Sequence, residues 1–466
     1  MPESATSPPS PANASANANE AGLRPELSAG QMAMVAVGGS IGTGLLLGSG
    51  AAIKLAGPAV IVSYVLAALI MGVVALAIGE MACVHPAAGS FGVYAELYLN
   101  PWAGFISRYG YWFAMVTSIG AEMVASATYA RYWFPHVPAW IFVLGFGAVL
   151  VGANVLPVLH YGWFEYWFAM LKVVTIVGFV VLSSVFLGSG RVAAQYTASD
   201  GFFANGALAP LLATAFAIFT FGGVEMVAIS SGEARAAKDI ARATWMMLGV
   251  LTFIYVGAIA VLVGVMPWRQ AGVAESPFVT VFRMAGLGGA ASAMNVVVLT
   301  AALSGANASI YSAARMVFSL ARTGYAPRGL GTLTRHGSPL RALLASSLGI
   351  VVAAWVAARY PAIAFIYMFG GALGGGVAAW MVSLAAHVVF RRRMTAAQIK
   401  ALPLRLPGGA VSSMVAFVAM GVAVLATWPT ELRVTLVGGV PILAGLTVAY
   451  FVTRGMRRTS TQTPTS

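Results

Sequence analysis

Repeated apolar runs of about 20 residues constrain this sequence more than any other feature, because runs of that length match the hydrocarbon thickness of a bilayer. Of the 466 residues, 59% are hydrophobic and only 8% are charged, whereas a soluble domain carries roughly a quarter charged residues. So few charges cannot cover a soluble surface of this size, and we expect an all-α integral membrane protein with about twelve transmembrane helices. The runs lie near residues 31–54, 58–80, 103–130, 138–157, 161–187, 208–231, 241–266, 289–320, 340–358, 361–390, 409–428 and 433–453.

The basic residues favour a membrane topology over a nucleic-acid partner. The net charge is +13, but most Lys and Arg residues fall in short segments between apolar runs, such as Arg391-Arg392-Arg393. Loops on the side of the two termini carry most of them, which places both termini in the cytoplasm by the positive-inside rule. This distribution forms no basic stripe for nucleic acid, and only Lys172 lies well inside an apolar run.

The two ends of the chain differ in composition from the apolar domain between them. Residues 1–27 are rich in Pro, Ser, Ala and Asn, so we expect a disordered cytoplasmic tail and no cleaved signal peptide. We expect residues 28–453 to form the transmembrane domain and residues 454–466 to form a cytoplasmic C-terminal tail. The single cysteine, Cys83, excludes an intramolecular disulfide.

Two apolar runs are interrupted by glycine at corresponding positions. The first contains GGSIGTG at residues 38–44, and the sixth contains FTFGGVE at residues 219–225. The positions correspond if residues 31–187 and 208–390 are two five-helix repeats, and the odd number of spans then inverts the second repeat. Paired interrupted helices in inverted repeats indicate the central site of a transporter. Close helix packing through small residues is the alternative explanation for either interruption alone.

Interrupted helices expose backbone groups that suit a zwitterion. N–H groups at the start of a half-helix attract an anion such as a carboxylate, and freed carbonyl groups attract a cation such as an ammonium. Such backbone is tolerated at membrane depth only where it lines a cavity. Ser40 and Thr43 add hydroxyl groups at the first interruption, and Phe219 and Phe221 supply apolar walls or ordinary packing at the second. A free amino acid carries both charges and is the expected ligand.

Five stretches of the chain carry recognisable motifs. In order, they are GGSIGTGLLLGSG (38–50), GEMACVHPAAGSFGVYA (79–95), EYWFAMLKVVTIV (165–177), FGGVEMVAISSGEA (221–234) and LSGANASIYSAARMVFSLARTGYAP (303–327). Together they resemble the amino acid permeases of the amino acid–polyamine–organocation (APC) superfamily, and most of all its bacterial amino acid transporter family.

The resemblance implies a LeuT-like fold of two inverted five-helix repeats plus two C-terminal helices, at about 409–453. It also implies proton-coupled uptake of amino acids across the bacterial inner membrane by alternating access. In this family the first interruption binds the substrate carboxylate and the second binds its amine. By position, the implied substrate-binding residues are Ser40, Ile41, Gly42, Thr43, Gly44, Phe219, Thr220, Phe221, Gly222 and the neighbouring Glu225.

Polar residues inside the apolar runs are candidates for ion coupling, because an unpaired charge there is costly and usually functional. Lys172 could carry the coupled proton or replace a sodium ion, or it could tether its helix as a permanent cation. Glu122 could belong to the proton route or pair with another polar group. Glu225 could bind the substrate amine, take part in proton transfer or cap the helix that follows. Ser304 and Asn307 could complete an ion site with Lys172 or act as polar contacts between helices.

The remaining polar residues indicate no catalytic or metal centre. The 5 histidines are scattered without metal-ligand spacing, and the sequence contains no Walker-type run for ATP. We therefore expect no cofactor, no metal and no enzymatic activity. Glu80, Arg108 and Glu233 lie near the ends of their runs, where we expect solvated interface charges in preference to gate salt bridges.

These features predict a secondary transporter that imports amino acids by proton symport, with a free amino acid, a proton and the lipid bilayer as its partners. An amino acid sensor on a transporter scaffold is the alternative, although only short tails are available for signalling. Phe219, Phe221 and the small-residue run at 370–376 favour a neutral or aromatic substrate. The acidic side chains of Glu122 and Glu225 mean that cationic and GABA-like substrates are not excluded.

Overall fold

The computed structural model describes residues 27–86, 90–155, 161–192, 195–196, 201–334 and 338–460. The predicted N-terminal tail, except for Leu27, lies outside the described residues. Residues 461–466 of the predicted C-terminal tail and two of the scattered histidines, His160 and His336, also lie outside them.

Every regular element in the described residues is a helix. Outside the helices, Leu27 and Ala234 form an isolated parallel β-bridge. The long helices are α4 (Val60–Val84), α6 (Pro101–Ala130), α8 (Tyr161–Val192), α11 (Ala237–Val265), α13 (Gly288–Arg322), α16 (Ala364–Arg393) and α19 (Val434–Ser460). The shorter helices are α2 (Ala29–Ser40), α3 (Ser49–Ala56), α5 (Ser90–Tyr98), α7 (Ala139–Val155), α9 (Ala209–Thr220), α10 (Met226–Ile229), α12 (Pro277–Met284), α14 (Leu340–Ser346), α15 (Leu348–Arg359), α17 (Ala396–Ala401) and α18 (Ala410–Leu425).

Within the described residues, 7 helical stretches are long and apolar enough to cross a bilayer. They are Gly44–Val84, Trp167–Val185, Ala237–Val265, Gly288–Arg322, Leu340–Arg359, Ala364–Arg393 and Glu431–Thr453. The helices α7, α9 and α18 are shorter but also apolar. The prediction of an all-helical membrane-spanning protein is therefore confirmed.

Two helices are interrupted where the sequence predicts it. The helix α2 ends at Ser40, Ile41 is extended with φ −80° and ψ 92°, and a π-helical turn (Gly44–Gly48) precedes α3. The helix α9 ends at Thr220, and a turn follows in which Gly223 has a φ of 102°, a value that favours glycine. The short helix α10 continues beyond this turn. Both glycine-rich segments thus break their helices, as predicted.

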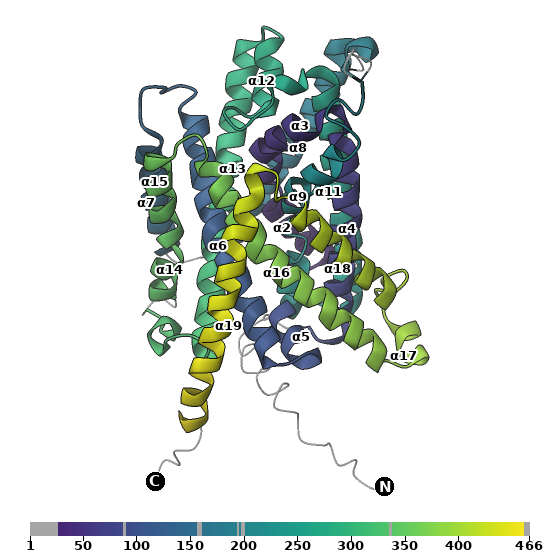
Figure 1. The fold of residues 1–466 in the computed structure, drawn as a ribbon, viewed down its shortest axis with the longest axis vertical. Helices are drawn as coiled ribbons and strands as arrows, with labels where there is room; N and C mark the ends of the chain where they lie inside the picture. Colours follow the sequence, from purple (N-terminus) through teal and green to yellow (C-terminus); the bar gives the residue numbers. More distant parts are fainter. Residues whose placement is uncertain are drawn as a thin grey trace.

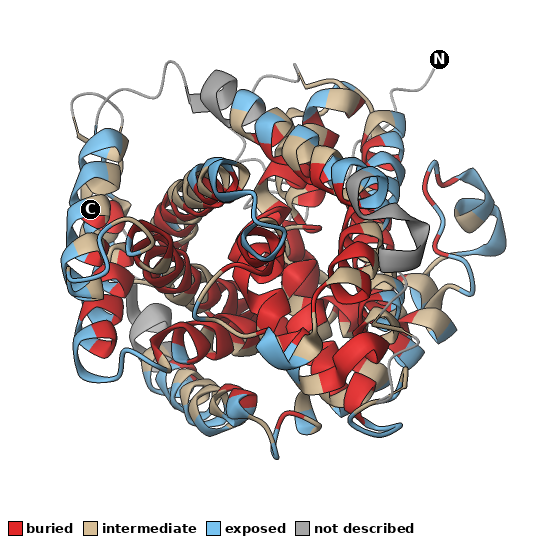
Figure 2. Ribbon diagram, turned by 90° about the horizontal axis from the view of Figure 1, so that it is seen from above, coloured by how far each residue is buried: buried red, intermediate tan, exposed pale blue. Residues whose placement is uncertain are grey.

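The interrupted helices lie inside the bundle. In Figure 1, α2 and α9 lie near the centre among α6, α13 and α16, while α7, α14 and α15 stand together on one side and α4, α11 and α18 on the other. The long helix α6 packs extensively against both α16 and α13. Viewed from above, buried residues gather in the middle and exposed residues lie outside (Figure 2).

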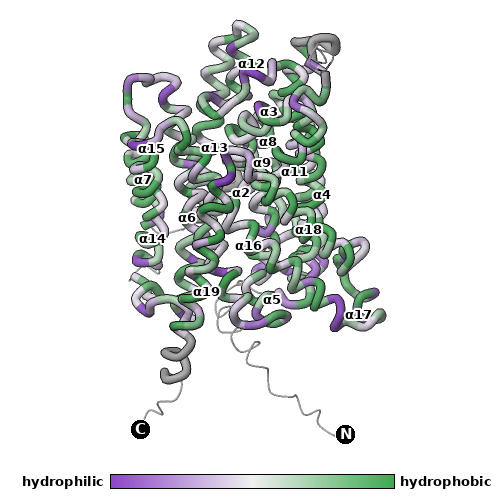
Figure 3. Tube along the Cα trace, in the orientation of Figure 1, coloured by the Kyte–Doolittle hydropathy of each residue, from purple (hydrophilic) through white to green (hydrophobic). Residues whose placement is uncertain are grey.

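The outer surface is apolar along the helices, as a lipid-facing surface should be. Val149, Val185 and Phe253 are 69%, 70% and 73% exposed, and hydrophilic segments gather near α12, α5 and α17 (Figure 3). The helix α19 ends at the same end of the molecule as α5 and α17, whereas α12 lies at the other end (Figure 1). We call the end with α5, α17 and the last turn of α19 the terminal end.

Candidate functional site

A cavity lies where the two interrupted helices cross. Its volume is about 80 Å³. The two interruptions and the helices α6, α13 and α16 supply its wall. The lining residues are Gly39, Ser40, Gly42, Gly44, Tyr111, Ala114, Met115, Ser118, Glu122, Phe219, Thr220, Gly222, Gly223, Glu225, Met226, Gly305, Ala308, Ser309, Ser312, Ala372, Gly376 and Trp380.

The two interruptions touch each other through glycine. A Cβ atom added to Gly223 would lie 3.0 Å from the Cα atom of Ser40, and one added to Gly44 would lie 3.0 Å from the Cα atom of Thr220. Side chains rarely approach a backbone so closely, so any larger residue at either glycine would push the two helices apart. Helix interruption and close packing, which are alternative explanations at the level of the sequence, occur together here.

Glu122 reaches the first interruption from α6. Its Oε1 atom accepts a hydrogen bond from the backbone N–H of Thr43 at 3.3 Å, and the residue is 6% exposed. Two glycines make room for the carboxyl group: a Cβ atom at Gly42 would lie 2.6 Å from Oε1, and one at Gly305 would lie 3.0 Å from the carboxyl carbon. A carboxyl group of the protein therefore already contacts backbone that the family resemblance assigns to a substrate carboxylate.

Three buried oxygen atoms at the first interruption have no hydrogen-bond partner in the described part of the chain. They are the hydroxyl oxygens of Ser40 and Thr43 and the Oε2 atom of Glu122. Leaving a buried polar atom unsatisfied costs about 1–3 kcal/mol, so native structures rarely keep several such atoms together without a function. Ser40 and Glu122 line the cavity, so two of these three atoms lie where a bound molecule can reach them.

Lys172 approaches the same interruption from α8. Its Nζ atom donates a hydrogen bond to the carbonyl oxygen of Gly38 at 2.9 Å, and the side chain is buried. Its positive charge acts electrostatically on the carboxyl group of Glu122. The structure thus brings two of the predicted coupling residues, from α6 and α8, to one end of α2.

Several other predicted residues lie beside the cavity and do not form its wall. Ile41 is fully buried next to the first interruption, and Ser304 is buried on α13. Asn307 accepts a hydrogen bond from the amide of Asn154 on α7 at 2.6 Å. The amide of Asn307 is therefore engaged with α7, while the ammonium of Lys172 is engaged with α2.

The second interruption is held by Glu225. Its Oε2 atom accepts a hydrogen bond from the backbone N–H of Gly223 at 3.2 Å and another from Nε1 of Trp380 on α16 at 3.3 Å. The hydroxyl group of Tyr111 on α6 also contacts this carboxyl group. Glu225 therefore fixes the turn that follows α9 and connects it to two neighbouring helices.

Two aromatic pairs flank the cavity. The ring of Phe219 lines it and lies 4.1 Å, between ring centroids, from Phe369 on α16. The ring of Phe221 points instead to Tyr255 on α11, with a centroid distance of 4.8 Å in an edge-to-face arrangement. The hydroxyl group of Tyr255 donates to the carbonyl oxygen of Ser40 at 2.7 Å. Phe221 thus packs behind the wall, where it connects the two interruptions through Tyr255.

The wall also contains residues that the sequence analysis did not select. They follow the helical period of three to four residues from selected positions, so each set shares one helix face. Counting backwards from Glu122 along α6, or forwards from the motif glycines on α13 and α16, could have found them. These residues are Tyr111, Met115, Ser118, Ala308, Ser309, Ser312 and Trp380, whereas Ala372 and Gly376 belong to the run at 370–376 that the sequence analysis did name.

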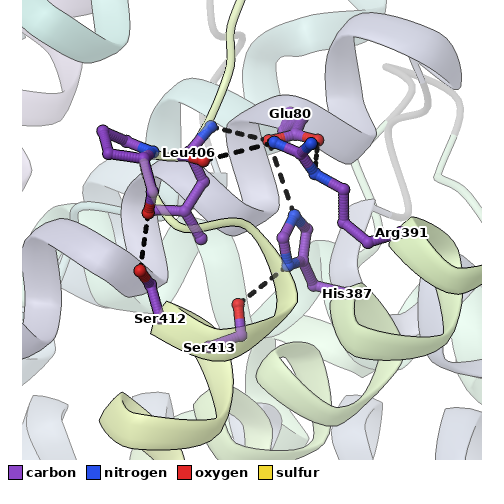
Figure 4. A network of polar contacts seen from close by, with 7 residues as sticks. Glu80, His387, Arg391, Leu406, Ser412 and Ser413 are labelled. Carbon is purple, nitrogen blue, oxygen red and sulfur yellow. Dashed lines mark hydrogen bonds and ion pairs between the residues drawn. The ribbon is translucent and has the colours of Figure 1, made fainter. Parts of the chain in front are cut away.

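A second buried carboxylate lies near the terminal end, at the end of α4 (Figure 4). The side chain of Glu80 is completely buried, and Arg391 contacts both of its oxygen atoms, at 2.5 Å from Nε and 2.8 Å from Nη2. The backbone N–H of Leu406 donates to Oε2 at 2.8 Å, and Nε2 of His387 lies 3.5 Å from the same atom. The expectation of a solvated charge at Glu80 is wrong, because the segment before α18 folds over the end of α4.

Arg108 is also buried, contrary to the same expectation. Its Nη1 atom pairs with Oε2 of Glu96 on α5 at 2.9 Å, and the hydroxyl group of Tyr325 donates to Oε1 at 3.1 Å. Glu233 is half-buried, and its carbonyl oxygen accepts the N–H of Leu27 at 2.9 Å. Polar contacts therefore connect several segments at the terminal end of the molecule.

Two interrupted helices that cross at a cavity inside an apolar bundle are typical of transporters. No cluster of three or more potential metal ligands from His, Cys, Asp and Glu occurs among the described residues. The chain belongs to the amino acid permease family, whose sequence profile matches residues 31–453. That family consists of transporters, so this is a membrane protein of amino acid transport.

Relatives in this family carry names with different substrates. YbxG of Bacillus subtilis, a probable threonine/serine transporter, is 33% identical over 439 residues, which cover 92% of this chain and 95% of that protein. The gamma-aminobutyric acid permease of the same organism is 36% identical over 397 residues, which cover 84% of this chain and 85% of that protein. The aromatic amino acid transport protein AroP of Escherichia coli is 35% identical over 365 residues, which cover 77% of this chain and 80% of that protein.

A solved structure shares the fold. The crystal structure of a manganese transporter mutant from Eremococcus coleocola matches with a TM-score of 0.57, covering 92% of this chain and 94% of that chain. The sequence identity is 14%, so the likeness concerns the fold alone.

Proposed function

We propose that this protein is a secondary active transporter that imports a free amino acid across the bacterial inner membrane together with a proton. The observation that carries this proposal is the cavity in which unpaired oxygen atoms of Ser40 and Glu122, at the first interruption, lie next to the backbone of the second. Transporters with interrupted helices bind their substrates at such crossings. Membership of the amino acid permease family supports the substrate class.

The proposed architecture has about twelve spans, arranged as two inverted five-helix repeats near 31–187 and 208–390 and followed by two further helices. The interrupted helices begin the two halves, which supports the repeat. The positive-inside rule supports a cytoplasmic location for the terminal end, because that end carries the basic run Arg391–Arg393.

In the proposed binding mode the substrate lies across both interruptions. Its carboxylate faces the backbone N–H groups of Thr43 and Gly44 and the hydroxyl group of Ser40. Its ammonium faces the carbonyl groups of the second interruption, where those of Thr220 and Gly222 accept no backbone hydrogen bond within the described residues. Each substrate charge then meets backbone dipoles of opposite sign, with no counter-charge required.

Glu122 is the proposed site of the coupled proton. As a carboxylate it accepts the N–H of Thr43, which the substrate carboxylate also needs. A proton on Glu122 removes the negative charge that strengthens this hydrogen bond, so Thr43 becomes available to the substrate. Lys172 holds the carbonyl of Gly38 and balances the carboxylate, and Ser304 adjoins Gly305 in the same proposed path.

Uptake by the purified protein in proteoliposomes tests this function. We expect radiolabelled amino acids to accumulate under an inward-acid pH gradient and a protonophore to abolish the accumulation. Glu122→Gln should keep substrate exchange but lose the stimulation by the gradient, whereas the surface variant Glu275→Gln should behave like the unmodified protein. Accumulation that is unaffected by the pH gradient would refute proton coupling. Amino acid binding without transport would favour the alternative function, an amino acid sensor on a transporter scaffold.

A further inference from the structure

The part of the cavity that remains after the substrate charges are placed is small. The volume of the whole cavity, about 80 Å³, is roughly half that of a cavity known to take up benzene, about 150 Å³. Once the carboxylate and ammonium of an α-amino acid lie at the two interruptions, the space left suits a short side chain and excludes an aromatic ring in this conformation.

The remaining wall offers hydroxyl groups. Ser118 on α6 and Ser309 and Ser312 on α13 line the cavity, and none of the three hydroxyl groups forms a hydrogen bond within the described part of the chain. Serines on the same kind of helix normally bond the carbonyl of the preceding turn, as Ser126 and Ser383 do at 2.8 and 2.7 Å. The three lining hydroxyl groups therefore remain available to a ligand.

No lining group is suited to a charged side chain. The described residues that line the cavity include no Lys or Arg, so nothing there would bind a second carboxylate. Glu225 already accepts hydrogen bonds from Gly223 and Trp380. Glu122 accepts from Thr43 and keeps one oxygen atom without a partner in the described part of the chain, but in the proposed function this carboxyl group carries the coupled proton and then offers no counter-charge. A cationic side chain would therefore be buried without a counter-charge, which makes a cationic substrate unfavourable.

From this size, polarity and charge we infer that the substrate is a small neutral α-amino acid with a side-chain hydroxyl group, of the serine and threonine class. Ser309 and Ser312, one turn apart on α13, would exchange hydrogen bonds with that hydroxyl group. This inference rests on the proposed amino acid transport and adds to it the substrate class. A site built to hydrogen-bond a substrate hydroxyl rejects an analogue without it far more strongly than a hydrophobic pocket does.

Competition between threonine and valine tests the inference directly, because the two differ by a hydroxyl group in place of a methyl group. We expect threonine to inhibit uptake of labelled serine at least about tenfold more effectively than valine, and more effectively than phenylalanine, lysine or GABA. The double substitution Ser309→Ala with Ser312→Ala should reduce the preference to within about threefold. Ser383→Ala, whose hydroxyl group is used within its own helix, should keep the full preference.

The outcomes separate this inference from the proposed function. Uptake of amino acids with equal inhibition by threonine and valine would overturn the serine and threonine class while leaving amino acid transport intact. Stronger inhibition by phenylalanine, lysine or GABA would do the same. Failure of every amino acid to be taken up, and of every one to raise the melting temperature of the purified protein, would overturn the proposed function itself. The comparison in the unmodified protein holds even if a serine variant fails to fold.

Discussion

Two buried carboxylates in this protein have opposite surroundings. Glu80, near the terminal end, has both oxygen atoms occupied by Arg391 and by the backbone of Leu406, with His387 close by (Figure 4). Glu122, at the central cavity, has one hydrogen bond to Thr43 and one oxygen atom without a partner. Both are almost inaccessible to solvent, so burial alone does not distinguish their functions.

The difference teaches how to separate a structural charge from a functional one in this fold. A buried carboxylate that pairs directly with an opposite charge joins segments, and Glu80, paired with Arg391, joins α4, α16 and the segment before α18. A buried carboxylate next to a cavity, with one hydrogen bond and no direct ion pair among the described residues, is left to respond to a ligand or a proton. We therefore expect substitutions around Glu80 to affect stability first and substitutions around the cavity to affect transport first.

The largest effect on transport is expected from Gly44→Leu. The added side chain has no room beside the backbone of Thr220, where even a Cβ atom would lie 3.0 Å from Cα, so the two interruptions cannot keep their crossing. Uptake in proteoliposomes should fall by at least about 100-fold, which corresponds to roughly 3 kcal/mol. Gly72→Leu is the matched control, because a Cβ atom at Gly72 on α4 meets nothing within 4 Å. Normal uptake by Gly44→Leu would contradict the central crossing.

The next effect is on stability, from Glu80→Gln. This substitution leaves the buried guanidinium of Arg391 without its counter-charge, which costs about 3–5 kcal/mol when one partner of a buried pair is removed. The melting temperature in detergent should fall clearly, and the additional substitution Arg391→Met should recover part of the loss. Glu275→Gln breaks the exposed pair with Arg283 and should change the stability by about 1 kcal/mol or less. Similar small shifts for both acids would remove the distinction drawn for Glu80.

Sequence reasoning predicted the two helix breaks better than the contacts at the terminal end, for a physical reason. Glycine-rich interruptions are local, so GGSIGTG and FTFGGVE indicated the two breaks, and both occur. The partner of Glu80 at Leu406 is 326 residues away along the chain, and no local pattern reports such a contact. The same limit applies to Glu122: its position inside an apolar run was evident, but its contact with Thr43 depends on how α6 packs against α2.

A smaller effect on transport is expected from Lys172→Met. The side chain keeps a similar length, but the carbonyl of Gly38 loses a charged donor, and such hydrogen bonds contribute about 1.5–3 kcal/mol. Uptake should fall by roughly tenfold or more, while the melting temperature should fall less than in Glu80→Gln. A variant that unfolds as readily as Glu80→Gln but transports normally would make Lys172 a structural tether, the other role that the sequence allowed.

The smallest effect is expected from Trp380→Phe, which keeps an aromatic ring beside the cavity and removes the Nε1–H that Glu225 accepts at 3.3 Å. One such hydrogen bond contributes about 0.5–1.5 kcal/mol, so the substrate concentration for half-maximal uptake should rise roughly two- to tenfold. Trp112→Phe is the control, because it removes a similar bond to Ser346 outside the cavity lining and should leave that concentration unchanged. If the concentration for half-maximal uptake is unchanged in both variants, Glu225 has a structural role like that of Glu80: it holds helices together and does not affect substrate binding.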